Sequence, residues 1–145
     1  MKFNKVVVSI HAHPDDTEAW CAGTLKLLKN KGYKIVIVTV TAGGMGGIGS
    51  DEANTIDIRR EEARKAASVL EADYHCLEAR DGYLFDTEEL RLAITSLLRK
   101  YQAGIVMTHL PMDYHVDHRV TCNIVEAATI VATLPNVPIS EPAME

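Results

Sequence analysis

The sequence has few cysteines, no long apolar run and no excess of basic residues. Its three cysteines, Cys21, Cys76 and Cys122, are odd in number and form no CxxC pair, which argues against a disulfide scaffold. We expect them to be reduced, partly buried core residues. No apolar stretch is long enough to span a membrane, and none follows a basic segment as in a signal peptide, so we expect a cytoplasmic protein.

Lys and Arg number 15 against 20 Asp and Glu, which gives a net charge of −5 with neutral histidines. The basic residues are scattered, whereas a nucleic-acid-binding surface needs them clustered, so we expect no nucleic-acid partner. The 145 residues are 47% hydrophobic. That length and composition predict one domain with its own core over residues 1–145.

Short strand-like runs, of which the first is rich in β-branched residues, alternate along the chain with segments of helical apolar spacing. The expected strands are residues 5–10, 34–41, 74–77 and 104–108, and the expected helices are residues 16–30, 56–70, 87–98 and 119–133. A glycine-rich segment at 43–49 is expected to be a mobile loop, and the proline-containing tail at 134–145 to be irregular. This order predicts a Rossmann-like α/β fold, a mostly parallel sheet with helices on both faces.

Two polar segments follow expected strands and hold five of the six histidines. The first contains His11 and His13, and the second contains His109, His115 and His118; both also carry aspartates. Because ligand sites of parallel sheets lie beyond the carboxyl ends of the strands, we expect the two segments to meet there. Zinc accepts imidazole and carboxylate ligands, and a catalytic zinc site uses three protein ligands and an open position.

Each of these residues also has a purely structural interpretation. Asp15 or Asp16 can serve as a helix-start carboxylate, and a single loop histidine is usually solvated. His75, within an expected strand, is interpreted as structural. Only the clustering of histidines and aspartates at two strand ends favours a metal site.

The glycine-rich segment offers a competing interpretation. Residues 44–49 fit the pattern GxGxxG, which can present backbone N–H groups to a pyrophosphate, but they follow the second strand and not the first. A substrate lid is another possible role. Arg59 and Arg60 fit either a charge-paired helix face or a contact to a polar substrate group. Asp81 and Gly82 fit either a turn or a substrate contact.

Several of these motifs together resemble the LmbE-like family, the PIG-L superfamily of zinc-dependent N-acetylglucosaminyl-phosphatidylinositol de-N-acetylases. The resemblance runs from the first strand to about Pro138. It is carried by Ala12-His13-Pro14-Asp15-Asp16-Thr17-Glu18, Gly23-Thr24-Leu25, Thr41-Ala42-Gly43, Arg59-x-x-Glu62 and His115-Val116-Asp117-His118.

The resemblance implies a role for each matching residue. His13, Asp16 and His118 would bind one Zn²⁺, with other divalent metals possible, and Asp15 would be the general base. His115 would stabilise the oxyanion or protonate the leaving amine, and Asp117 would orient it. Arg59 would contact the substrate.

We therefore expect a zinc-dependent N-deacetylase acting on a small N-acetylated glucosamine-type sugar or its conjugate. The alternatives are a non-catalytic or truncated metal-binding domain and a nucleotide-binding Rossmann domain. Family members continue with further strands and a helix, so we expect this chain to be truncated at its C-terminus. An exposed sheet edge would then favour a homo-oligomer.

Overall fold

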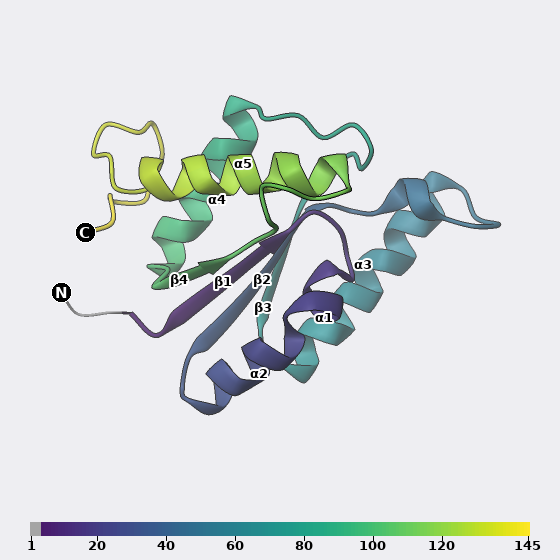
Figure 1. The fold of residues 1–145 in the computed structure, drawn as a ribbon, viewed down its shortest axis with the longest axis horizontal. Coiled ribbons are helices and arrows are strands. Elements are labelled where there is room, and N and C mark those ends of the chain that lie inside the picture. The colour runs from purple at the N-terminus through teal and green to yellow at the C-terminus, as the bar shows by residue number, and fades with distance from the viewer. Residues whose placement is uncertain (1–3) are drawn as a thin grey trace.

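The computed structural model describes residues 4–145 and contains a four-stranded parallel sheet (Figure 1). The strands are β1 (Val6–His11), β2 (Lys34–Thr41), β3 (Asp73–Ala79) and β4 (Ile105–Met107), in the order β3-β2-β1-β4. Every residue of β2 after Lys34 is buried, as expected of a parallel strand covered on both faces. The predicted fold class is confirmed.

Helices cover both faces of the sheet. One face carries α1 (Asp16–Trp20), α2 (Ala22–Asn30) and α3 (Glu52–Val69); the other carries α4 (Glu88–Tyr101) and α5 (Val116–Val131). Alternate residues of β1 face the two sides: Val7 packs with Leu25 of α2, and Val8 packs with Ile124 of α5.

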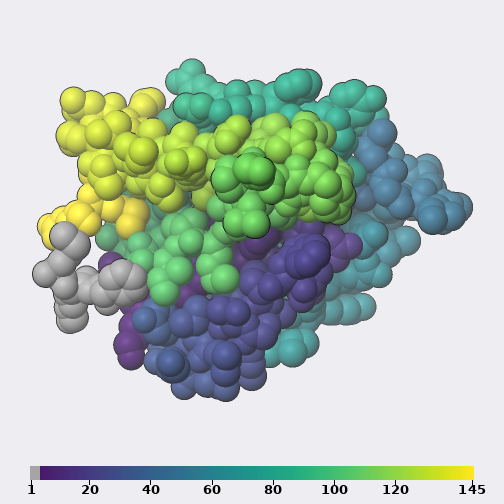
Figure 2. All heavy atoms as spheres, in the orientation of Figure 1, coloured from purple at the N-terminus to yellow at the C-terminus, as the bar shows by residue number. Residues whose placement is uncertain are grey.

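The strand order reverses between β1 and β4. The chain first builds outward from β1 to β2 and β3, and then returns to place β4 on the other side of β1. In Figure 2 the segment around residues 104–115 lies between α5 above and α1 and α2 below. Such a reversal opens a crevice at the carboxyl ends of the two central strands, where α/β proteins bind their ligands.

We expected one continuous helix over residues 16–30, and this prediction is wrong. α1 ends at Trp20 and α2 begins at Ala22, because Cys21 between them has φ −137° and ψ 2°, outside the helical region. Cys21 is buried and packs with Leu25 against the sheet. With the break, α1 stays at the end of β1 while Cys21 and Leu25 pack on the sheet. Trp20, the last residue of α1, is 71% exposed.

The glycine-rich segment packs closely against α3 and contains a 3₁₀ turn, η1 (Gly44–Gly46). A Cβ atom on Gly44 would lie 2.8 Å from Cγ1 of Ile56, and one on Gly47 would lie 2.0 Å from Oγ1 of Thr55. These glycines therefore permit close approach of the loop to the helix, a use that requires no bound nucleotide.

Both α3 and α5 begin earlier than the sequence predicts. α3 was expected from residue 56, yet it begins at Glu52 because Asp51 caps it by accepting a 2.8 Å hydrogen bond from the Asn54 N–H. α5 starts at Val116 instead of residue 119, with His115 as its N-cap. His118 thus lies in a helical first turn and not in a loop.

The C-terminal tail is irregular, as predicted, and Arg99 of α4 holds it. The Arg99 side chain is 2% exposed and donates hydrogen bonds to the carbonyl oxygens of Ala132, Leu134 and Glu141. This arrangement satisfies carbonyls at the end of α5 and ties the tail to α4. No helix within residues 4–145 has the length and apolar character that crossing a membrane requires.

Candidate functional site

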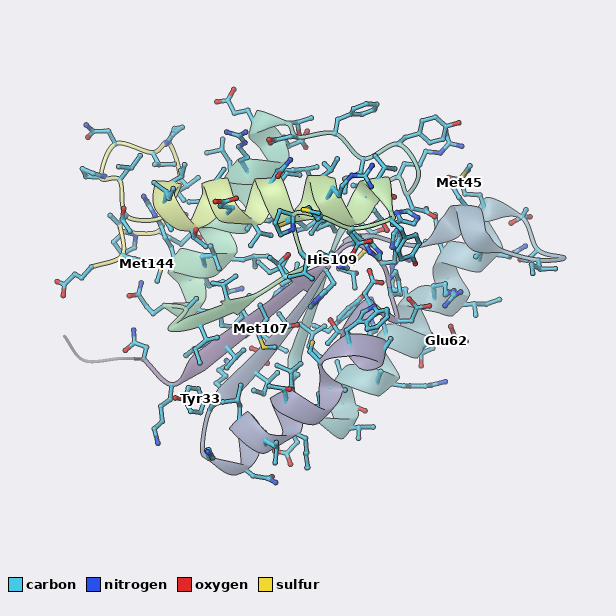
Figure 3. The ribbon with its side chains drawn as sticks, viewed as in Figure 1. Tyr33, Met45, Glu62, Met107, His109 and Met144 are labelled. Atoms are coloured by element: carbon cyan, nitrogen blue, oxygen red, sulfur yellow. The ribbon has the colours of Figure 1, made fainter. Side chains whose placement is uncertain are left out.

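The polar segments that follow β1 and β4 meet at the strand-order reversal, as the sequence predicts. β1 and β4 are hydrogen-bonded neighbours, so the segments leave the sheet side by side. His118 Nε2, at the start of α5, lies 3.3 Å from Oδ1 of Asp16, at the start of α1. His109, labelled in Figure 3, lies between the sheet and α5.

Asp16 is the centre of the cluster. Its carboxylate is buried, and its Oδ2 atom accepts a 2.7 Å hydrogen bond from the His13 N–H. The same oxygen lies 3.3 Å from Nδ1 of His13 and 3.3 Å from Nε2 of His109. Both carboxylate oxygens of Asp16 thus face imidazole nitrogens.

The far nitrogens of two of these imidazoles contact carboxylates. His13 Nε2 lies 3.1 Å from Oδ2 of Asp117, and His118 Nδ1 lies 3.1 Å from Oδ1 of Asp113. A ring that donates its far N–H to a carboxylate keeps a bare lone pair on the near nitrogen, which is how metal-binding histidines are commonly oriented. The near nitrogens here are the ones that face Asp16.

The spacing of these atoms fits a divalent metal. Metal bonds of about 2.0–2.1 Å in tetrahedral geometry put two ligand atoms roughly 3.3 Å apart. Oδ2 of Asp16 lies 3.3 Å from Nδ1 of His13, and the other oxygen, Oδ1, lies 3.3 Å from Nε2 of His118. Two sets of three side chains hold donor atoms within 4.8 Å of one another: His13, His115, His118 and Asp16, His109, His118. Neither set is the full triad His13, Asp16 and His118 that the family resemblance implies; each contains two of its three members.

Burial and charge shift the titration of this cluster. Burial alone would raise the pKa of Asp16, but the facing imidazoles of His109 and His13 and the His13 backbone N–H hold the pKa well below its usual range. Burial opposes charge on His13 too, yet Asp16 and Asp117 raise the pKa of this imidazole. Burial lowers the pKa of His118. The site therefore keeps an ionised carboxylate in a low-dielectric setting, which suits a bound cation.

Asp15 points away from its neighbour Asp16. Its backbone has φ 100°, a left-handed conformation that is rare for residues other than glycine. The Asp15 side chain is 64% exposed, and its Oδ2 pairs with Nη1 of Arg59 on α3 at 3.1 Å. Adjacent carboxylates are thereby separated, one buried among imidazoles and one at the mouth of the site.

His115 is oriented by backbone groups. The ring Nδ1 of His115 accepts a 3.2 Å hydrogen bond from the Asp117 backbone N–H, and the backbone N–H of His115 donates to Oδ1 of Asp113 at 2.9 Å. Because Nδ1 is the acceptor, a neutral His115 ring carries its proton on Nε2. We expected the Asp117 side chain to orient His115; in the structure the Asp117 backbone contacts His115, and the Asp117 carboxylate contacts His13.

Several residues that complete the site had no role assigned from the sequence. His109 Nε2 accepts a 2.9 Å hydrogen bond from the Ala12 N–H, and its ring stacks on His118 with centroids 3.8 Å apart. His109 was noticed only as one member of the histidine cluster. Which backbone group it would contact depends on tertiary packing, so the sequence carried no signal for this role.

Asp81 and Gly82 tie the glycine-rich turn to the site. Both carboxylate oxygens of Asp81 accept from the Met45 N–H, at 3.2 and 3.1 Å, while the Gly82 N–H donates to Oδ2 of Asp117 at 2.7 Å. Met45 is labelled on this turn in Figure 3. These contacts lie within the protein, and Asp81 also lines the pocket described next.

A pocket of about 250 Å³ collects the predicted site residues from both segments and from α3. Its lining comprises His13, Pro14, Asp15, Asp16, Gly43, Gly46, Arg59, Asp81, Tyr114, His115 and His118. Of the residues expected from the resemblance, Asp117 alone is absent from this lining; it is fully buried behind His13.

Comparison with known proteins shows which proteins this chain is similar to. A family model described as PIG-L, GlcNAc-PI de-N-acetylase, matches residues 8–129. Diacetylchitobiose deacetylase of Thermococcus kodakarensis is 35% identical over 138 residues, which cover 91% of this chain and 52% of that protein. A 4-oxalmesaconate hydratase of Pseudomonas putida is 26% identical over 136 residues, covering 88% of this chain and 53% of that protein.

A solved structure agrees with the fold. The N,N'-diacetylchitobiose deacetylase of Pyrococcus horikoshii, complexed with its inhibitor MPG, superimposes with a TM-score of 0.85 at 33% sequence identity. The match covers 91% of this chain and 52% of that one. The chain thus spans about half the length of the curated relatives it matches.

Proposed function

Since this chain belongs to the PIG-L family of GlcNAc-PI de-N-acetylases, we propose that it serves the zinc-dependent hydrolysis of an N-acetyl group on a glucosamine-type sugar or its conjugate. The observation that carries the proposal is the convergence of His13 and His118 on the buried carboxylate of Asp16, at 3.3 Å each. Diacetylchitobiose deacetylase, at 35% identity, supports the substrate class.

His13, Asp16 and His118 would hold the zinc ion, through Nδ1, a carboxylate oxygen and Nε2 respectively. In a neutral ring, the carboxylates of Asp117 and Asp113 would hold the single proton on the far nitrogen and leave Nδ1 of His13 and Nε2 of His118 bare for the metal. When bound, zinc would polarise the amide carbonyl and lower the pKa of its water to about 7.

Asp15 would take the proton of the attacking water. It lines the same pocket as the three ligands but lies outside their cluster, so its carboxylate would not bind the metal and could accept the proton. Arg59 fixes the position of Asp15 through their 3.1 Å ion pair. In this arrangement Arg59 can also contact a polar group of the substrate, because it lines the pocket beside Asp15.

His115 would stabilise the tetrahedral oxyanion with its Nε2–H, and the proton that Asp15 takes from the water would pass to the leaving amine. The hydrogen bond from the Asp117 N–H to Nδ1 favours the tautomer with the proton on Nε2. Donation to the oxyanion requires that tautomer, so the N-cap geometry of α5 supports this role.

The hydratase relative favours a second candidate function. 4-Oxalmesaconate hydratase is 26% identical to this chain, and a metal site with a nearby carboxylate base can also activate water for addition to a double bond. The higher identity to a deacetylase makes amide hydrolysis our first choice.

The test is metal analysis followed by assays on both substrate types. Purified protein should contain about one zinc per chain and release acetate from N,N'-diacetylchitobiose; a chelator should stop the reaction and added zinc should restore it. Metal binding with hydration of 4-oxalmesaconate and no acetate release would support the second function. Zinc without either activity would mean a non-catalytic metal-binding domain.

A further inference from the structure

Asp113 contacts both histidines at the start of α5. Its Oδ1 atom lies 3.1 Å from Nδ1 of His118 and accepts a 2.9 Å hydrogen bond from the His115 N–H. The Asp113 side chain is 18% exposed. One oxygen thus connects a histidine expected to bind metal with a histidine expected to act on the substrate.

The contact with His118 decides which of its nitrogens is available. A neutral imidazole has one N–H and one bare nitrogen, and a carboxylate beside Nδ1 draws the proton there. Nε2 is then bare, and it is Nε2 that faces Asp16 at 3.3 Å. Stacking of His109 on the His118 ring, with an interplanar angle of 6°, restricts tilting of the ring but not which nitrogen carries the proton.

We propose that Asp113 is a positioning residue that presents Nε2 of His118 to the metal and fixes His115 beside it. The inference rests on the proposed zinc site and adds a residue to it. Asp113 and Asp117 then have parallel roles, because each carboxylate contacts the far nitrogen of one histidine.

If Asp113 only stabilised its own loop, loosening the loop at another residue would weaken zinc binding equally. The hydrogen bond to the His115 N–H, two residues along the chain, is a local turn contact that any well-formed loop can contain. Arg119 supports the same loop, because its Nη1 donates to the Asp113 backbone carbonyl without contacting the carboxylate. Arg119→Met therefore loosens the loop and leaves the Asp113–His118 contact in place, which makes it the matched control.

The experiment measures zinc affinity at fixed pH by competition with a chromophoric chelator, together with the melting temperature of each metal-free variant. Asp113→Ala should weaken zinc binding about 10- to 100-fold. Asp113→Asn, which keeps the acceptor oxygen but not the charge, should recover part of this loss. Arg119→Met should lower the melting temperature but change zinc affinity less than about threefold, in the range of ordinary surface substitutions.

A second comparison isolates the route through His118. In a His118→Ala background, adding Asp113→Ala should cause no further loss of zinc affinity. The inference is overturned if Asp113→Ala binds zinc as tightly as wild type, if Arg119→Met weakens binding equally, or if the losses in the double variant add. Weakened zinc binding in Asp113→Ala beside a wild type that releases no acetate would uphold the inference and reject only deacetylation. A wild type that binds no zinc would reject both.

Discussion

Oδ2 of Asp117 lies 3.1 Å from Nε2 of His13, although the two residues are 104 positions apart in the chain. This contact joins the segment after β1 to the first turn of α5. Gly82, which donates to the same oxygen, adds the segment after β3. The orientation of His13 therefore depends on three segments being in place, those that follow β1, β3 and β4.

Replacing Asp15 by Asn should abolish most of the activity and leave the metal in place. The amide cannot accept the water proton, and general bases typically contribute about 10²- to 10⁴-fold. Acetate release and zinc content should be measured on the same samples, with Asp57→Asn, an exposed residue paired with Arg60, as the control. An Asp15→Asn protein that hydrolyses substrate at the wild-type rate would remove Asp15 from the mechanism.

Gly47→Ala should displace the glycine-rich turn, because its Cβ would lie 2.0 Å from Oγ1 of Thr55. We expect a loss of about 1–3 kcal/mol in the free energy of unfolding and lower activity, since the same turn lines the pocket. Gly46→Ala is the control, because a Cβ there meets nothing within 4 Å. Equal unfolding free energies for the two variants in urea would contradict this packing.

His11 should make stability depend on pH. Burial, reinforced by the neighbouring His109, lowers the pKa of His11 from 6.5 to about 4. Between these values the unfolded chain binds the proton and the folded protein does not, so stability is full above pH 6.5 and falls as the pH drops towards 4, by about 3 kcal/mol.

The measurement is urea unfolding between pH 4.5 and 7.5 with a chelator present, which keeps metal release out of the result. His11→Asn should flatten the pH dependence, whatever its effect on stability at neutral pH. The same slope in both proteins would show that another group is responsible.

Arg99→Met should destabilise the protein by about 3 kcal/mol, because it leaves buried carbonyl oxygens of the C-terminal tail without their charged donor. Limited proteolysis should then cut the tail beyond Ala132. Zinc affinity should not change, since the tail contributes nothing to the pocket lining. Arg64→Met, at an exposed position of α3, is the matched control. Resistance of the Arg99 variant to proteolysis would argue against the role of Arg99 in holding the tail.

Much of the fold follows from local sequence patterns. β1 and β2 are buried β-branched runs, which favour parallel strands, and the order of helices and strands favours a parallel sheet. β3 has no β-branched residue and was expected only over residues 74–77. The break at Cys21 was not predictable, because apolar spacing continues through it and only packing on the sheet interrupts the helix. The early start of α3 was missed although Asp51 is a good capping residue.

The site, like the fold, could be predicted only in part. Clustering of histidines at two strand ends indicated where it forms, since parallel strands bring their carboxyl ends together. The partner of each imidazole could not be read from the sequence. The family resemblance implied that Asp117 orients His115, but in the first turn of α5 the Asp117 carboxylate contacts His13. Only three-dimensional packing distinguishes these partners.

The left-handed backbone of Asp15 lowers stability at the residue that we propose as the general base. A non-glycine residue at φ 100° costs on the order of 1–3 kcal/mol, and glycine would relieve that cost at once. Directed evolution for heat resistance alone would therefore favour loss of this carboxylate. A selection for thermal stability therefore has to include a selection for activity, or it will yield a more stable protein that lacks the proposed base.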